Sequence, residues 1–382
     1  MLQLYRKFHW ESESDDSLNE RARDWFKKLE TGDPEATSIW KQFRKISLRE
    51  FKRLYQILGV EFDFYHGESF YNDKLNSTMD ILKDANILEE SQNALIVNLD
   101  EYNLPPALIM KSDGATLYMT RDLAAAIYRY STYNFYRCLY VVGVPQKLHF
   151  QQLQFVLKKM GYPWWNTIIH VEFGHVIGLT TRGQGEFILL EDVITEATEK
   201  AAEVLENRTE AKEARIGKIP DAEKKSIAQA VGLGALIFSD LKNRRAKDVE
   251  FDWNRVLNFE GDTGPYCQNA HVRCCGIFRK YDGIVTPEVD FSMLAADEEF
   301  NLIKILGEYT ETLEKAAENF EPSMLSTYVL SLSKLFNIFL IKHRVLDENI
   351  LQTKARILLV HGIKTVLAKS LEILGVKPFD RM

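Results

Sequence analysis

The 382 residues of this chain are 46% hydrophobic and 27% charged, and the formal net charge is −7 at pH 7. Such a composition supports a sizeable core and excludes a disordered or collagen-like chain. The acidic balance argues against broad non-specific binding of nucleic acid, which depends on neutralising phosphates, although it is compatible with a local basic face.

The sequence carries no signal for a membrane segment or for secretion. Its longest apolar stretches, such as 235–238, are far shorter than the ~20 residues of a membrane span. Residues 1–10 are not followed by an apolar block or a small-residue cleavage site. The four cysteines have neither a C-x-x-C pair nor the spacing of a disulfide framework, so we expect reduced core thiols. We therefore expect a cytoplasmic protein with no membrane partner.

Residues 17–60 have the apolar spacing of helices. Asp16 or Ser17 can cap the first helix, and Gly59 is a suitable stop for the last one. We expect residues 1–60 to form a helical insertion of the domain that follows.

After residue 60 the sequence pattern changes to short apolar runs that alternate with helical stretches. The runs lie at 95–99, 108–110, 139–142, 168–171 and 187–190. The intervening helical stretches lie at 78–85, 121–130 and 148–160. This alternation predicts a parallel α/β sheet covered on both faces, with a ligand site beyond the carboxyl ends of its strands.

The remainder of the chain has only helical patterns. Residues 196–230 are rich in Glu, Lys and Ala and are expected to form a solvated helix interrupted near 217–220. Apolar stripes at 325–339 and 359–374 then predict a helix bundle.

The most informative stretch is residues 111–126, which read Lys-Ser-Asp-Gly-Ala-Thr-Leu-Tyr-Met-Thr-Arg-Asp-Leu-Ala-Ala-Ala. Ser-Asp-Gly is typical of a turn, and Thr120 is a plausible N-cap for a helix with Asp122 in its first turn. A carboxylate at a helix N-terminus is stabilising by itself. That explanation does not account for Tyr118 and Arg121, which join Asp122 where an α/β sheet places its site.

This stretch resembles the signature of arginyl-tRNA synthetases. Three further segments are similar to the family, in the family's order: 139–143 followed by Gln146, His149 and Phe150; 170–174; and 259–273. The whole chain therefore resembles a bacterial-type arginine-tRNA ligase, a class I aminoacyl-tRNA synthetase, without its N-terminal part. The resemblance implies a partial Rossmann-like parallel sheet at 61–250, followed by an all-α anticodon-binding bundle at 251–382.

The resemblance also implies roles for individual residues. Tyr118, Asp122 and Gln146 would hold L-arginine, since a carboxylate can pair with the guanidinium fork. The residues expected to face ATP, with its associated Mg²⁺, are His149, His170, Phe173 and Gly174. From the residues alone, a satisfied histidine on a helix face is the favoured interpretation of His149, and the resemblance reverses this preference. No metal held by the protein itself is expected.

The expected RNA partner is tRNA(Arg), and no DNA partner is expected. The candidate contacts are Arg244, Arg245, Gln268, His271, Arg273, Asn337 and Met382. Composition alone is equally compatible with a solvated charged face around Arg244 and Arg245. Gln268, His271 and Arg273 could position RNA or instead hold the domain junction.

Two elements of the family are missing from these residues. The chain has no His-Ile-Gly-His-type element, and residues 178–185 read Gly-Leu-Thr-Thr-Arg-Gly-Gln-Gly in place of a Lys-Met-Ser-Lys-like loop. Arg182 is therefore the one catalytic candidate. The first hypothesis is ATP-dependent activation of arginine and its transfer to tRNA(Arg). We expect this activity to be impaired in the present chain unless a longer gene product or a second polypeptide supplies the missing half of the sheet. The alternative is a non-catalytic paralogue that binds arginine, tRNA or a protein partner.

Overall fold

The computed structural model describes residues 2–111, 118–177, 189–216, 220–256, 258 and 261–381. The chain divides into two compact units, Met1–Tyr65 and His66–Met382, and each is described by itself.

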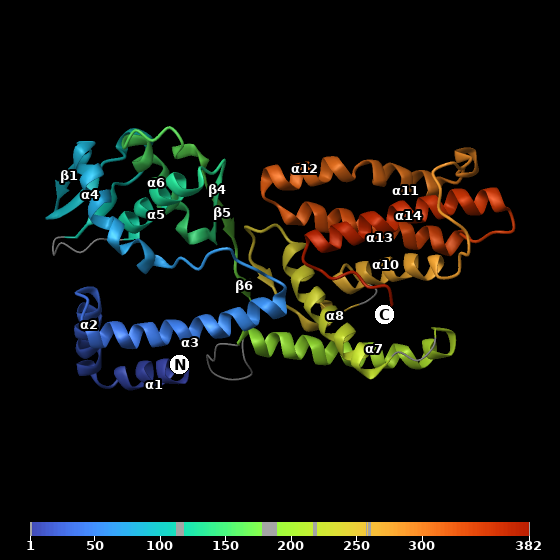
Figure 1. The fold of residues 1–382 in the computed structure, drawn as a ribbon, viewed down its shortest axis with the longest axis horizontal. Coiled ribbons are helices and arrows are strands. Elements are labelled where there is room, and N and C mark those ends of the chain that lie inside the picture. Colours follow the sequence, from blue (N-terminus) through green and yellow to red (C-terminus); the bar gives the residue numbers. More distant parts are fainter. Residues whose placement is uncertain are drawn as a thin grey trace. The chain divides into compact units, whose positions relative to one another are not determined.

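The first unit is helical, as the sequence predicts. Its helices are α1 (Leu2–Ser12), α2 (Asp16–Glu30) and α3 (Pro34–Leu58) (Figure 1). The predicted cap of α2 is one residue too late, because Asp15 has the extended backbone and accepts a hydrogen bond from the Ser17 amide. The predicted stop at Gly59 is confirmed, and its φ of 68° is the left-handed conformation that favours glycine.

The second unit begins with two 3₁₀ turns, helices and a small sheet. These elements are η1 (Glu68–Lys74), α4 (Leu75–Asp84), β1 (Leu88–Ser91), β2 (Ala94–Val97), η2 (Asp100–Tyr102) and β3 (Ala107–Met110). The three strands pair antiparallel in the order β1-β2-β3, so the predicted place of the runs at 95–99 and 108–110 in a parallel sheet is wrong. The two-residue turn between β1 and β2, where Gln92 (φ 49°) and Asn93 (φ 61°) both take the positive φ of a tight hairpin, makes that pair antiparallel, and β3 then pairs antiparallel with β2.

The predicted parallel pairing holds for the next two strands. The elements are α5 (Tyr118–Tyr133), β4 (Cys138–Gly143), η3 (Val144–Gln146), α6 (Lys147–Lys159), η4 (Trp165–Thr167) and β5 (Ile168–Phe173). β4 and β5 run parallel, with Cys138 opposite Ile168 and Gly143 opposite Phe173. Fully buried side chains of α5, α6 and β5 pack together over one face of this sheet, and Tyr140 and Val142 of β4 pack against them.

Two apolar side chains of β4 are exposed. Leu139 is 44% exposed and Val141 is 65% exposed, and among the described residues the sheet has only the strands β4 and β5. One apolar face of β4 is therefore uncovered within this part of the chain.

The next elements are β6 (Val176–Ile177), α7 (Leu190–Ile216), α8 (Asp221–Leu241) and β7 (Val249–Glu250). Leu190 begins α7 rather than ending a strand, and the rest of the predicted run at 187–190 lies mostly outside the described residues. The predicted helix break near 217–220 is confirmed at Pro220, which precedes α8 with a non-helical ψ of 144°, and 217–219 lie outside the described residues. The prediction that this region is simply solvated is wrong for one face of α7, because Ala197 and Ala201 are fully buried against α8.

The rest of the second unit is helical, which confirms the predicted bundle (Figure 1). Its elements are α9 (Trp253–Val256), α10 (Gly264–Phe278), η5 (Phe291–Met293), α11 (Asp297–Gly307), α12 (Tyr309–Asn319), α13 (Pro322–Lys342) and α14 (Ile350–Ile373). The predicted stripes meet in one core, to which α13 contributes Leu332, Phe336 and Phe339 and α14 contributes Ile363 and Leu367.

Helix α13 is long and strongly apolar. By length and composition alone α13 could cross a membrane, contrary to the expectation that no segment could. A bundle core helix passes the same test, and nearly half of α13 is buried here.

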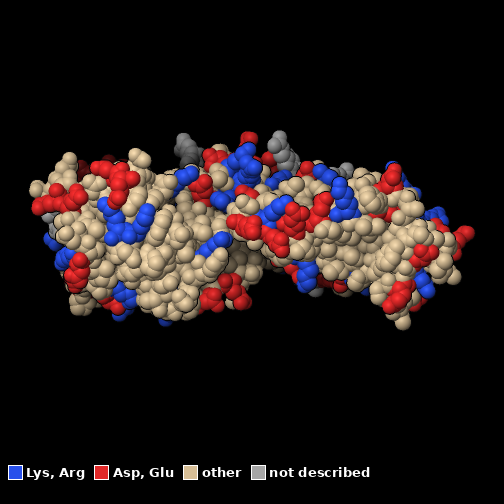
Figure 2. Space-filling view, turned by 90° about the horizontal axis from the view of Figure 1, so that it is seen from above, with Lys and Arg blue, Asp and Glu red and all other residues tan. Residues whose placement is uncertain are grey.

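Figure 2 shows basic and acidic side chains interspersed among large uncharged areas on the face in view, with no broad basic region among the described residues there.

Candidate functional site

The first part of the site lies where α5 and α6 begin. In the described residues α5 starts at Tyr118. Thr120 therefore lies inside the helix, and the prediction that it is the N-cap is wrong. Its hydroxyl instead donates to the Ile109 carbonyl of β3 at 2.6 Å, which fixes α5 against that strand. Asp122, one turn into α5, is joined to His149 in the first turn of α6, with 2.7 Å between Oδ2 and Nε2. The structure thus brings together two residues that the sequence assigned to different ligands.

Tyr118 and Gln146 flank this pair. Tyr118 lies one helical turn before Asp122 and is 66% exposed. Gln146 ends η3, three residues before His149, and is also exposed. Within the described residues neither side chain makes a hydrogen bond to protein, so both are available to a ligand. Residues 112–117 of the same motif lie outside the described residues.

An aromatic layer packs beneath the pair. Phe150 lies between Tyr140 and His170, with ring centroids 4.8 Å and 4.9 Å away. The guanidinium of Arg129 lies 5.1 Å from the Tyr140 ring. Burial raises the pKa of Tyr140, which remains a neutral phenol at physiological pH, and its hydroxyl has no partner among the described residues. Tyr140 lies in the family-like segment 139–143 but was predicted to have no role of its own, and Arg129 lies outside all the segments that carry the resemblance.

The second part of the site is the carboxyl end of β5. The His170 Nε2 lies 3.1 Å from the Val142 carbonyl, and the Phe173 side chain is 44% exposed. The Gly174 amide donates to the Arg245 carbonyl at 2.7 Å. A Cβ at Gly174 would lie 2.4 Å from the Lys247 carbonyl group, so only glycine fits there. The predicted approach of this backbone to adenine therefore cannot use the Gly174 amide in the present arrangement.

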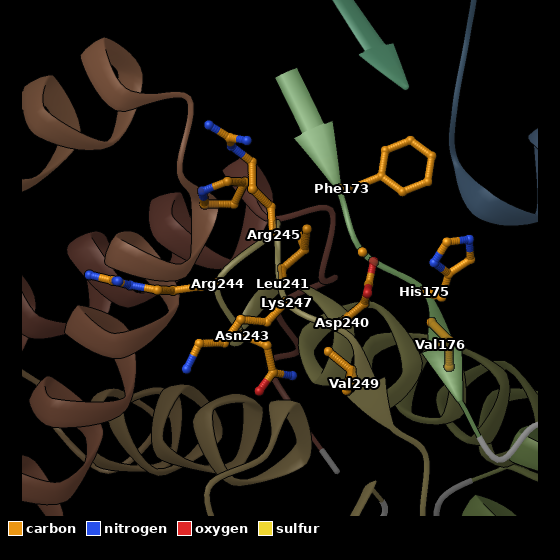
Figure 3. Close-up of a pocket in the computed structure, with 12 residues that line it drawn as sticks. Phe173, His175, Val176, Asp240, Leu241, Asn243, Arg244, Arg245, Lys247 and Val249 are labelled. Carbon is orange, nitrogen blue, oxygen red and sulfur yellow. The ribbon is translucent and has the colours of Figure 1, made fainter. Parts of the chain in front are cut away.

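A cavity of about 340 Å³ opens beside this strand end (Figure 3). Phe173 and His175 lie on one side of it in Figure 3, and Arg244 and Arg245 lie on the other. Burial raises the pKa of Asp240 at the cavity, and within the described part of the chain no cation pairs with its carboxylate. The cavity combines a carboxylate, two arginines and an aromatic ring next to the predicted ATP residues.

Arg245 binds protein groups on both sides of the junction with the bundle. Its Nη1 donates to the Glu172 carbonyl of β5 at 2.7 Å, and its Nε donates to the Phe320 carbonyl at the end of α12 at 2.9 Å. Its amide also donates to Glu321 Oε1 at 3.3 Å. This arrangement favours a joining role over the predicted tRNA contact. Arg244 is exposed and has no partner among the described residues, so it remains open to RNA.

Two other predicted RNA contacts are buried. The Gln268 side chain donates to the Lys377 carbonyl at 2.9 Å, and His271 Nδ1 donates to the Phe379 carbonyl at 2.7 Å. Burial lowers the pKa of His271, which keeps it neutral. These bonds hold the segment after α14, which favours the junction alternative for both residues.

The last predicted contacts are placed together on the surface. Arg273 Nη1 donates to Asn337 Oδ1 at 2.7 Å, so the exposed Arg273 and the half-buried Asn337 form one polar group across α10 and α13. Arg182 and Met382 lie outside the described residues.

Two family models match most of the chain. Residues 1–253 match the family of class I tRNA synthetases (R), catalytic domain, and residues 267–382 match the DALR anticodon binding domain. The arginine-tRNA ligase of Clostridium botulinum is 45% identical over 389 residues, a match that covers all of this chain and 67% of the relative. That of Halothermothrix orenii is 44% identical and is covered to 66%. The chain spans about two thirds of the length of these curated relatives.

Solved structures give the same result. Arginyl-tRNA synthetase from Plasmodium falciparum has a TM-score of 0.83 at 27% identity, with 96% of this chain and 62% of that chain covered. The Thermus thermophilus enzyme has a TM-score of 0.76 at 22% identity, covering 96% and 70%. The chain therefore belongs to the arginine-tRNA ligase family of class I aminoacyl-tRNA synthetases, whose members activate arginine with ATP and charge tRNA.

Proposed function

We propose that this chain binds L-arginine, ATP and tRNA(Arg) and takes part in activating arginine and transferring it to tRNA. The observation that carries the proposal is the Asp122 carboxylate. His149 fixes its Oδ2 at 2.7 Å, while Oδ1 accepts no hydrogen bond from the described residues. An anchored carboxylate with an open oxygen suits the fork of a guanidinium. Tyr118 and Gln146 can supply the further polar contacts that distinguish arginine from lysine.

ATP is assigned to the carboxyl end of β5, where parallel sheets of this kind bind ligands. The exposed ring of Phe173 lies at this end, and His170 lies in the middle of the same strand. The described residues contain no group of three His, Cys, Asp or Glu side chains arranged to hold a metal. We infer that Mg²⁺ reaches the site with the phosphates of ATP.

We propose that activation needs a polypeptide that completes the sheet. The exposed apolar face of β4, with Leu139 and Val141, is the place where such a polypeptide would pack. Residues 1–382 contain no His-Ile-Gly-His-type element to stabilise charge on the α-phosphate. Since each lost donor of this kind costs about 10²- to 10³-fold in rate, we expect little activity from these residues alone.

The arginine site is tested by calorimetric titration of L-arginine into the wild-type chain and into Asp122→Asn. Loss of the charge-assisted pairing should weaken binding about 10- to 100-fold. Asp84→Asn is the matched control, because Asp84 is exposed at the end of α4 and makes no side-chain contact in the described chain. If the wild-type chain does not bind arginine, the proposal is wrong.

The activity is tested by arginine-dependent exchange of pyrophosphate into ATP, followed by charging of tRNA(Arg). Each assay is run with the chain alone and with a polypeptide comprising the part of the Clostridium botulinum relative that this chain does not match. We expect exchange only with the added polypeptide. Arginine binding without exchange in either case would favour the second candidate, a non-catalytic paralogue, which the absence of a lysine from residues 178–185 also favours.

A further inference from the structure

We propose that His149 is a positioning residue of the arginine pocket, which orients the Asp122 carboxylate for the substrate guanidinium. This inference rests on the proposed function, because it assigns the guanidinium to Asp122. It replaces the predicted contact of His149 with ATP.

The first observation is the bond itself. His149 Nε2 and Asp122 Oδ2 are 2.7 Å apart, although the residues belong to different helices and are separated by 27 positions. The side chains are 25% and 34% exposed, so water competes only partly for the bond. The imidazole is also packed edge-on against Phe150, with 5.3 Å between ring centroids, and Phe150 is stacked on His170. Packing against Phe150 holds the His149 ring in place, and the ring in turn orients the Asp122 carboxylate through the hydrogen bond.

The second observation is that the nearby cations have other partners. Arg121, next to Asp122, lies 3.9 Å from the Glu68 carboxylate. Lys147, two residues before His149, lies 3.7 Å from Glu172. Within the described residues the His149 imidazole is therefore the one group that hydrogen-bonds or pairs with the Asp122 carboxylate.

The chemistry of the pair suits this role. An imidazole N–H donated from Nε2 occupies a single acceptor position of the Asp122 carboxylate. A carboxylate has about four acceptor positions, so one bond on Oδ2 leaves both oxygens able to accept from the two N–H groups of a guanidinium. The terminal torsion of an aspartate is otherwise broad. Holding it before the ligand arrives removes an ordering cost from binding.

The test compares L-arginine with L-citrulline, its neutral isostere, by calorimetric titration and competition. His149→Ala should weaken arginine about 3- to 10-fold, the effect of ordering one side chain. It should leave citrulline nearly unchanged, because citrulline gains no charge pairing from the carboxylate. His149→Gln should restore most of the arginine affinity, since its amide nitrogen can donate from a similar position. His9→Ala, an exposed histidine of the first unit, is the matched control.

The outcomes separate the two proposals. If the wild-type chain binds arginine and His149→Ala binds both ligands as the wild type does, the positioning role is overturned while the proposed function stands. If His149→Ala weakens both ligands equally and lowers the melting temperature, the residue is merely structural, and the inference is overturned again. If the wild-type chain fails to bind arginine, the proposed function falls and this inference falls with it.

Discussion

Replacing Arg245 with alanine should lower the free energy of unfolding, because Arg245 joins β5 to the helix bundle. The guanidinium donates to the Glu172 carbonyl at 2.7 Å and to the Phe320 carbonyl at 2.9 Å. A hydrogen bond with a charged partner contributes about 1.5–3 kcal/mol, so two bonds give about 3–6 kcal/mol. Arg245 is half-buried, and water can partly satisfy the freed carbonyls. We therefore expect Arg245→Ala to lower the free energy of unfolding by about 2–4 kcal/mol.

The assay is urea-induced unfolding followed by tryptophan fluorescence and circular dichroism. Arg244→Ala is the matched control, because Arg244 is exposed and without a partner in the described chain, and it should change stability by less than about 0.5 kcal/mol. Arg245→Lys should fall between the two, since an ammonium can reach only one of the carbonyls in this geometry. Equal stabilities for Arg245→Ala and Arg244→Ala would refute the assignment of Arg245 as the joining residue.

Three further predictions concern other contacts. Gly174→Ala places a Cβ 2.4 Å from the Lys247 carbonyl group and should cost about 1–3 kcal/mol in thermal unfolding. Arg356→Ala leaves the buried Glu299 carboxylate, now 2.7 Å from Arg356 Nε, without its ion partner and should cost about 3–5 kcal/mol in urea unfolding. Bonds from Lys342 and His343 lower the pKa of Glu298 from 4.5 to about 2. The unfolded chain then takes up this proton first, so the contribution is complete above pH 4.5 and is lost as the pH falls toward 2.

Each of these predictions has its own contrary result. A Gly174→Ala variant that melts like the wild type would mean that the Lys247 backbone moves away readily. If Arg356→Ala and the double replacement Arg356→Met with Glu299→Leu are equally unstable, the unpaired charge is not the cause. For Glu298, the difference in urea midpoint between the wild type and Glu298→Gln should shrink as the pH falls from 5 to 2, and a constant difference would exclude the linkage.

Long helices were predictable because their signal is repeated many times. The stripes of α13 and α14 recur over several turns, and both meet in the core. The direction of β1, β2 and β3 was not predictable in the same way. These strands have four residues each, and their pairing depends on two positive φ angles at Gln92 and Asn93. Gln-Asn lacks the glycine that usually marks such a hairpin.

The sequence motifs predict which residues belong to the site, but they do not predict which of these residues contact one another. The motifs identify Asp122 and His149 separately, and only the packing of α5 against α6 brings them within 2.7 Å. The same limit applies to Gln268 and His271, for which two roles were open. Choosing between those roles required the position of the segment that contains Lys377 and Phe379, and that position is a long-range property of the fold.

The close approach of α7 and α8 has a mechanical consequence. A Cβ at Gly232 would lie 2.6 Å from the Ala197 carbonyl oxygen, so the two backbones touch and neither helix can roll past the other. The two helices therefore pack as one unit. Helix α8 ends at Leu241 in the cavity wall, so its packing against α7 helps to hold Asp240 and Leu241 in place at the cavity.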